Sequence, residues 1–160
     1  MDRIDKILKH DLFLYHLKQN NAAEADRRFC RHNIAHFLDV ARIGEIINLE
    51  ENIGVDRELV YGAALLHDMG RHIQYEEGTS HEKAGGEIAP GILADCGYTA
   101  EEIDIITDAI LHHRDKSIME EKSLRGILYR ADKASRACFM CDVEEECNWK
   151  REKKNTVIKY

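Results

Sequence analysis

The chain has 160 residues, with 23 Lys and Arg against 30 Asp and Glu, a net charge of −7 and a single proline. This length predicts one domain over residues 1–160, able to bury a core without disulfides or metal staples. The acidic balance argues against a protein that neutralises the phosphates of a nucleic-acid duplex. No apolar run approaches the ~20 residues of a membrane span, and the N-terminus lacks the apolar core of a signal peptide. Five cysteines, an odd number without an export signal, predict reduced thiols in a cytoplasmic protein.

Apolar residues at helical spacing predict an all-α fold, a single compact bundle of about six to seven helices. Residues 1–20 predict one helix or a pair of short helices, with Asn20-Asn21 as the break. A long helix is expected over residues 25–49, where two apolar stripes indicate packing on two sides. His32, on the border of one stripe, is predicted to point inward, and His36 is a second candidate one turn further on.

A deeply buried helix is expected from Asp56 to Asp68, because residues 60–66 are small or apolar on most of its circumference. Asp56 is the predicted N-cap, and Gly70 is expected to end the helix in a left-handed conformation. His67 and Asp68 then lie on the last turn. An ionised carboxylate there is costly unless a cation or several donors compensate it. Taken alone, the dipeptide is better explained by an aspartate cap and a hydrogen-bonded core histidine.

The next residues predict a charged loop from Arg71 to Thr79, which includes His72. Ser80 is a plausible N-cap for a helix that begins at His81. This helix is expected to kink or break at Pro90-Gly91, because proline removes a backbone donor and clashes with the preceding turn.

Thr99 begins a capping-box sequence, and the amphipathic helix that follows ends in His112-His113. Residues 117–120 are expected to cap the next segment. Its apolar stripe continues into Asp132, which predicts another buried carboxylate in need of a partner.

Successive helical segments therefore each contribute a residue of metal-ligand type: His32, His67-Asp68, His81, His112 or His113, and Asp132. In order and spacing these residues resemble the H…HD…D pattern of the HD-domain superfamily of metal-dependent phosphohydrolases, over about residues 31–133. An HD dipeptide alone occurs by chance. A dipeptide that ends a buried helix, with a histidine one helix earlier and an Asp-Lys on a late apolar stripe, is far more specific.

The additional His81 and His112-His113 resemble the subset of this superfamily that binds two metal ions, in which the HD aspartate bridges them. The resemblance implies the ligands His32, His67, Asp68, His81, His112, His113 and Asp132. His113 fits the single histidine of that pattern better than His112. Imidazole and carboxylate suit Fe, Mn, Ni or Zn. For one of the two histidines, a cationic side chain at a helix C-terminus is a reasonable alternative.

The resemblance implies hydrolysis of a phosphoester or phosphoanhydride, in a nucleotide or another small phosphorylated metabolite, by a metal-activated water. Asp68, Arg71 and Lys133 are the residues predicted to act in catalysis, since Arg71 stands where the family often has Lys or Arg. Arg114 and Arg136 are further cationic candidates, and His72 is a candidate general acid. For each cation, a solvated or ion-paired side chain is an equally good explanation.

A cysteine-containing tail is expected from about residue 138, beyond the region of resemblance. Cys138, Cys141 and Cys147 could supply three thiolates of a separate zinc ion, with Cys30 or a histidine as the fourth ligand. A zinc site usually has two pairs of ligands and only one pair is present, so free or redox-sensitive thiols are favoured. Cys96 is expected to be a lone buried thiol.

Two other functions fit the same ligands. Some members with the H…HD…H…H…D set resemble diiron oxygenases, which use O2 to cleave a C–C or C–P bond. A non-catalytic sensing module could use the metal only to hold its helices together. Ligands alone do not separate these functions, and the sequence carries no signal for the oligomeric state.

Overall fold

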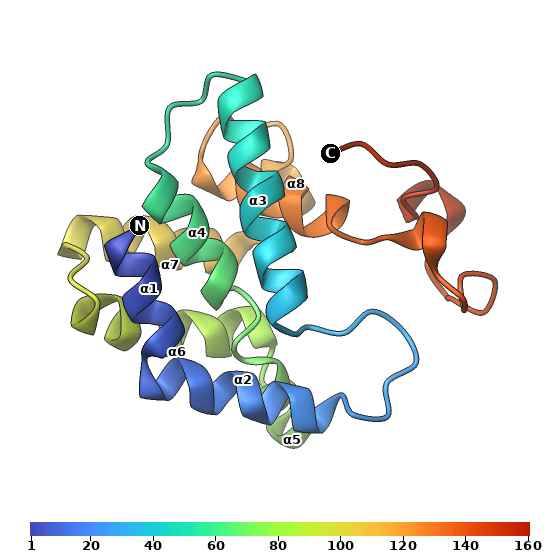
Figure 1. Cartoon of the computed structure of the whole chain (residues 1–160), viewed down its shortest axis with the longest axis horizontal. Coiled ribbons are helices and arrows are strands. Elements are labelled where there is room, and N and C mark those ends of the chain that lie inside the picture. Colours follow the sequence, from blue (N-terminus) through green and yellow to red (C-terminus); the bar gives the residue numbers. More distant parts are fainter.

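Eight α-helices and three short 3-10 turns, with no β-strand, make up the computed structural model, which describes residues 1–160 (Figure 1). The α-helices are α1 (Asp2–Lys9), α2 (Asp11–Ala23), α3 (Ile34–Glu50), α4 (Arg57–Leu66), α5 (Arg71–Glu77), α6 (His81–Asp95), α7 (Ala100–His112) and α8 (Leu124–Ala134). The 3-10 turns are η1 (Lys116–Ile118), η2 (Cys138–Met140) and η3 (Arg151–Lys153). The predicted all-α fold is confirmed. The helices outnumber the expected six to seven because α1 and α2 are separate and the expected loop after Arg71 is helical.

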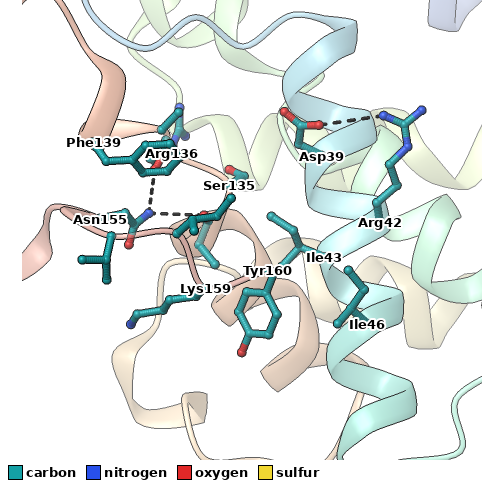
Figure 2. A pocket seen from close by; sticks show the side chains of 14 residues that line it. Asp39, Arg42, Ile43, Ile46, Ser135, Arg136, Phe139, Asn155, Lys159 and Tyr160 are labelled. Atoms are coloured by element: carbon teal, nitrogen blue, oxygen red, sulfur yellow. Dashed lines mark hydrogen bonds and ion pairs between the residues drawn. The ribbon is translucent and has the colours of Figure 1, made fainter.

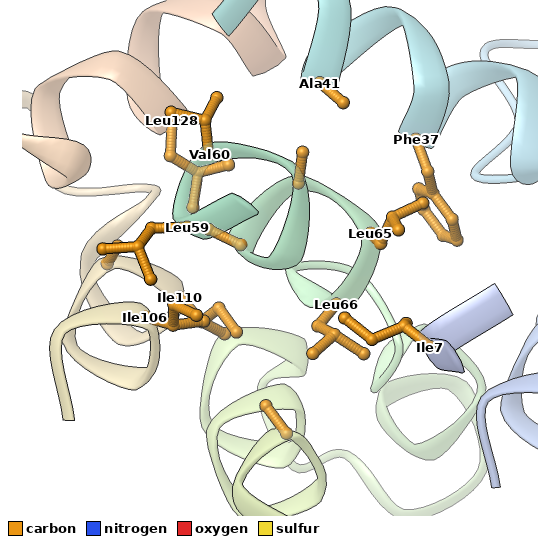
Figure 3. Packing of buried hydrophobic residues seen from close by; sticks show 14 of the residues in the cluster. Ile7, Phe37, Ala41, Leu59, Val60, Leu65, Leu66, Ile106, Ile110 and Leu128 are labelled. Carbon is orange, nitrogen blue, oxygen red and sulfur yellow. The ribbon is translucent and has the colours of Figure 1, made fainter. Parts of the chain in front are cut away.

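Helix α4 lies at the centre of the bundle and contacts α1, α3, α6, α7 and α8. Seven of its ten residues are buried, as the run of small and apolar residues predicts. Apolar side chains of the surrounding helices close around it (Figure 3), namely Ile7, Phe37, Ala41, Ile106, Ile110 and Leu128. The predicted N-cap is confirmed, since the side chain of Asp56 accepts a hydrogen bond from the Glu58 amide. The buried C-terminal end of α4 therefore delivers the following residues into the interior.

Gly70 differs from its expected role. Its φ is −83°, outside the left-handed region, and it precedes α5 instead of ending α4. A Cβ at this position would lie 2.6 Å from the Ala84 Cβ and 2.7 Å from the His81 carbonyl oxygen. Glycine is needed here because the backbone passes directly against the start of α6, and not because of its conformational freedom.

The boundary between α2 and α3 also differs from the expectation. Helix α3 begins at Ile34, with Asn33 as its N-cap, so residues 25–33 lie outside it. Asn20 does not break the helix: it is buried inside α2, where its amide nitrogen donates to the Asp68 carbonyl and its oxygen accepts from the His72 amide, both at 2.9 Å. Because both bonds reach the turn between α4 and α5, Asn20 fixes that turn against α2.

Three further predictions concern helix ends. Pro90 lies inside α6 and does not break it, because residues beyond it, such as Ile92, pack fully into the core. The capping box at Thr99 is confirmed at the start of α7. The expected cap at residues 117–120 is wrong: Ser123 is the residue whose side chain accepts a hydrogen bond at the start of α8.

The tail leaves the end of α8, loops outward and returns toward α3 and α8 (Figure 1). A pocket lies where it returns, between the outer face of α3 and the last residues up to Tyr160 (Figure 2). The Asn155 amide donates to the carbonyls of Lys133, Ala134 and Arg136 and so binds the tail to the end of α8. No helix is both long and apolar enough to cross a membrane.

Replacing Gly70 with alanine is expected to lower the free energy of unfolding by about 1–3 kcal/mol, because the new methyl group has no room against α6. Gly91→Ala is the matched control, since a Cβ there meets nothing within 4 Å and alanine favours the helix. Urea unfolding followed by circular dichroism measures both. Equal or greater stability of Gly70→Ala would contradict the close approach.

Candidate metal centre

Two groups of ligand-type side chains meet inside the bundle and share one residue, Asp68. The first group is His36, His67, Asp68 and Asp132, and the second is Asp68, His81 and His113. Within each group the ligand atoms lie within 4.8 Å of one another, and every residue is buried. Residues from five helical regions therefore converge on one place.

Every ligand candidate lies at or next to a helix end. His36 is on the first turn of α3, and His67 directly follows the last residue of α4. His81 is the first residue of α6, and His113 is the C-cap of α7. Asp132 lies on the last turn of α8. The bundle is thus packed so that these helix ends surround the turn that carries Asp68.

The Asp68 carboxylate faces the two groups with a different oxygen. Oδ2 lies 3.3 Å from Nε2 of His67 and 3.7 Å from Nε2 of His36. Oδ1 lies 3.2 Å from Nε2 of His81 and 3.7 Å from Nε2 of His113. Such a carboxylate can coordinate one cation through each oxygen and bridge the two.

All four histidines have their Nδ1 atoms engaged away from the centre. The partners are the carbonyls of Ala64 for His67 and Ile110 for His113, the amide oxygen of Gln74 for His81, and the hydroxyl of Ser135 for His36. The Ser135 hydroxyl donates to the Asp132 carbonyl, so it is left as an acceptor for a proton on His36 Nδ1. A proton on Nδ1 leaves the lone pair of Nε2 directed at the centre.

The free Nε2 atoms fit metal ions. Nε2 of His36 and of His67 is buried without a hydrogen-bond partner. Nε2 of His81 lies 3.2 Å from Nε2 of His113, so two acceptor nitrogens face each other. Imidazole nitrogens combined with carboxylates are the donor set of Zn, Fe, Mn and Ni sites. The two groups sharing Asp68 are therefore consistent with a dinuclear metal site.

Burial and nearby charges shift the pKa values of Asp68 and His67 in opposite directions. Burial raises the pKa of Asp68, but the nearby charges of His67 and Arg71 hold that pKa well below its ordinary value. Burial likewise lowers the pKa of His67, but Asp68 and Asp132 raise it to about 9, so without an ion its Nε2 carries a proton that a metal would displace. The pKa of His81 falls to about 2, chiefly through burial. Two ionised carboxylates thus lie among buried imidazoles, an arrangement that a cation stabilises.

Three cationic side chains touch the two carboxylates. Arg71 Nε lies 3.0 Å from Asp68 Oδ1. Lys133 Nζ lies 2.8 Å from Asp132 Oδ2, and Arg136 Nη2 lies 3.2 Å from Asp132 Oδ1. Arg71 and Lys133, expected from the sequence to act in catalysis, therefore both lie against ligand candidates.

His32, the predicted first ligand, lies beside the centre but belongs to neither group. Its Nδ1 is 2.6 Å from a Glu24 oxygen, and its Nε2 is 3.7 Å from Asp68 Oδ2. His36 stands in the first group instead. Asn33 is the sequence signal for this difference, because asparagine is a good N-cap. A helix that begins after Asn33 carries His36, and not His32, on its first turn.

His112 also lies outside both groups. Its Nδ1 bonds the Asp108 carbonyl at 2.8 Å, and its side chain is 41% exposed. Successive residues on a helix point about 100° apart, so His112 and His113 do not both face the centre. Arg114 points away as well, toward Glu82.

Two other candidates lie elsewhere. His72 is buried, with Nε2 2.9 Å from Nδ1 of His16, and takes part in neither group. The tail cysteines Cys138, Cys141 and Cys147 form no ligand group, because no three ligand atoms among them and their neighbours gather within 4.8 Å. The structure therefore does not support the separate zinc ion. Cys96 is buried, as expected.

Metal content tests the two groups separately. Asp68→Ala is expected to lose both metal equivalents, and His113→Ala only one, because Asp68 is shared and His113 is not. His112→Ala is the matched control and is expected to keep both. Elemental analysis after loading with Mn²⁺ or Fe²⁺ without oxygen measures the content, and circular dichroism verifies the fold. Full metal content in Asp68→Ala, or equal loss in the two histidine variants, would contradict the shared site.

Comparison with known proteins agrees with this geometry. The HD domain family matches residues 33–137, which include every member of both groups. A crystal structure described as a predicted HD superfamily hydrolase, from an uncultured Thermotogales bacterium, has a TM-score of 0.63 and 26% identity, covering 89% of this chain and 80% of that one.

Sequence relatives fall into two kinds. An uncharacterized protein of Clostridium beijerinckii is 49% identical over 160 residues, 100% of both chains. Ribonuclease Y of Mycoplasma mycoides subsp. mycoides is 35% identical over 102 residues, 64% of this chain but only 18% of that protein. The match to ribonuclease Y thus concerns one part of a much longer protein. With a family match over residues 33–137 and a fold and ligand arrangement that agree with it, the chain belongs to the HD-domain family.

Proposed function

We propose that this protein is a metal-dependent phosphohydrolase that cleaves a phosphoester or phosphoanhydride of a nucleotide or another small phosphorylated metabolite. The observation that carries the proposal is the Asp68 carboxylate, whose two oxygens face two separate groups of ligands. The solved relative is described as a predicted hydrolase, which supports the reaction class.

Each part of the centre has a role in this chemistry. Two divalent ions, when bound, supply a Lewis acid for phosphoryl oxygens and lower the pKa of a bound water. His36, His67 and Asp132 would hold one ion, His81 and His113 the other, and Asp68 both. The hydrogen bonds to Nδ1 keep the imidazoles oriented before any ion arrives, which lowers the entropy lost on binding.

The cations favour an anionic substrate. Arg71, Lys133 and Arg136 outnumber the carboxylates of Asp68 and Asp132 even before any ion is counted. Positive charge is therefore concentrated at the two ligand carboxylates, although the whole chain carries −7. Arg71 and Lys133 each have N–H groups beyond those bonded to the carboxylates, and these can donate to the non-bridging oxygens of a phosphoryl group.

The ribonuclease Y relatives raise RNA as an alternative substrate. The chain spans only 18% of the ribonuclease Y sequence to which it is 35% identical, so that activity does not transfer by itself. The acidic charge of this chain disfavours long nucleic acids, because they bind largely through neutralised phosphates. A small phosphorylated molecule is therefore the proposed substrate class.

A panel of phosphate compounds tests the reaction. Protein loaded with Mn²⁺ or Fe²⁺ is expected to release phosphate or a nucleoside monophosphate from at least one nucleotide in the absence of O2, and to stop when a chelator removes the metal. A short RNA oligonucleotide belongs in the panel, and O2 uptake with organic substrates is followed in parallel. O2 consumption with C–C or C–P cleavage would instead identify an oxygenase. A fully loaded protein that turns over no phosphoester would contradict the proposal.

Replacing Arg71 tests its predicted role. Arg71→Ala is expected to reduce kcat/KM by about 10- to 100-fold, the effect of one charge-assisted hydrogen bond, while metal content is retained. Arg114→Ala is the matched control, because Arg114 is 58% exposed and its ion-pair partner is Glu82. If both variants had the wild-type kcat/KM, Arg71 would have no part in the reaction.

A further inference from the structure

A buried carboxylate holds His32 in place next to the metal centre. Glu24 and His32 are each only 3% exposed. One Glu24 oxygen accepts from the His32 backbone amide at 2.7 Å, and the other lies 2.6 Å from His32 Nδ1. The Tyr75 hydroxyl also donates to Glu24, at 2.7 Å. Both the backbone and the ring of His32 are therefore fixed.

Glu24 is ionised in this environment. Burial raises its pKa, but the hydrogen bonds from His32 and Tyr75 lower it to about 2. An ionised and buried carboxylate is costly. Anchoring the loop would require only the bond to the His32 backbone, so the second bond, to the ring, indicates that the direction of the imidazole matters.

The ring of His32 directs its Nε2 at Arg136. The Arg136 Nη2 lies 3.3 Å from this nitrogen and 3.2 Å from Asp132 Oδ1. His32 is not part of either ligand group. Its position therefore fixes the guanidinium of Arg136 at the edge of the first group.

Arg136 has unused hydrogen-bonding capacity. Its side chain is only 7% exposed, yet its Nε is buried without a hydrogen-bond partner. A buried donor without a partner is costly, and an acceptor supplied by a ligand would remove that cost. The planar guanidinium matches two oxygens of a phosphoryl group, which gives it a geometric preference for that ligand.

Asp132 Oδ1 connects Arg136 to metal binding. This oxygen lies 3.5 Å from Nε2 of His36 and 3.8 Å from Nε2 of His67, so it faces the interior of the first group. A cation there would share Oδ1 with Arg136. The positive charge of Arg136 is then less fully compensated by Asp132 and is available to an anion beside the metal.

We propose that Arg136, oriented by the Glu24–His32 pair, binds a phosphoryl oxygen of the substrate at the edge of the first ligand group. This inference rests on the proposed phosphohydrolase function for its substrate. Arg136 contacts the substrate, whereas Glu24 and His32 are positioning residues that act through it.

Binding of inorganic phosphate to the metal-loaded full chain tests Arg136 directly. Arg136→Ala is expected to weaken phosphate binding by about 10- to 100-fold and to raise KM by a similar factor, with a smaller change in kcat and two metal equivalents retained. Arg136→Lys is expected to recover part of the affinity, since it keeps the charge without the planar fork. Arg42→Ala, on the outer face of α3, is the matched control. Unchanged phosphate affinity in a fully loaded Arg136→Ala protein would overturn the proposal.

His32→Gln and Glu24→Gln test the positioning role. Both are expected to weaken phosphate binding in the same direction as Arg136→Ala and to add little when combined with it, while metal content stays at two. Loss of a metal equivalent in His32→Gln would show that His32 is a ligand, and would overturn this role. Should wild-type protein hydrolyse no phosphoester and still bind phosphate through Arg136, the proposed function would fail and the anion site would remain.

Discussion

The Asp68 carboxylate is completely buried and ionised, and the arrangement of the bundle follows from the need to compensate its charge. It follows the end of α4, a helix with no polar face toward solvent over most of its length. The carboxylate has no surface exposed to bulk solvent, so protein groups or bound cations must compensate its charge. The helix ends that carry the histidines meet around this one residue. Burial of this part of the chain therefore requires apolar side chains along α4, and polar or cationic groups around the carboxylate that follows it.

The same helix ends also orient the ligands. The last carbonyls of a helix have no intrahelical partner, and they accept hydrogen bonds from side chains that lie next to them. His67 and His113 use this property: each directly follows its helix, and each Nδ1 bonds a carbonyl three residues earlier. The bond satisfies the carbonyl and fixes the imidazole with Nε2 toward Asp68. The ends of α4 and α7 thereby determine which nitrogen of each ring faces Asp68.

Much of the centre could be predicted from sequence because its signals are local. His67, Asp68 and Asp132 continue apolar stripes, and such stripes give the direction of a side chain directly. The choice between His32 and His36 depended on where α3 begins, and helix boundaries are weakly encoded when a loop also contains apolar residues. A local pattern also carries no information on contacts between distant segments. Gly70 fits a helix cap by its position in the sequence, but glycine is required there because the start of α6 lies directly against it.

The three cations around the centre support the proposed anionic substrate. The chain as a whole is acidic, which would repel phosphates over long distances, but screening limits that repulsion to about 8 Å at physiological ionic strength. Within the centre, Arg71, Lys133 and Arg136 are held against carboxylates that metal ions would also bind. Each ion that binds weakens the hold of those carboxylates on the cations. Metal binding, as proposed, would therefore raise the affinity of the centre for an anion.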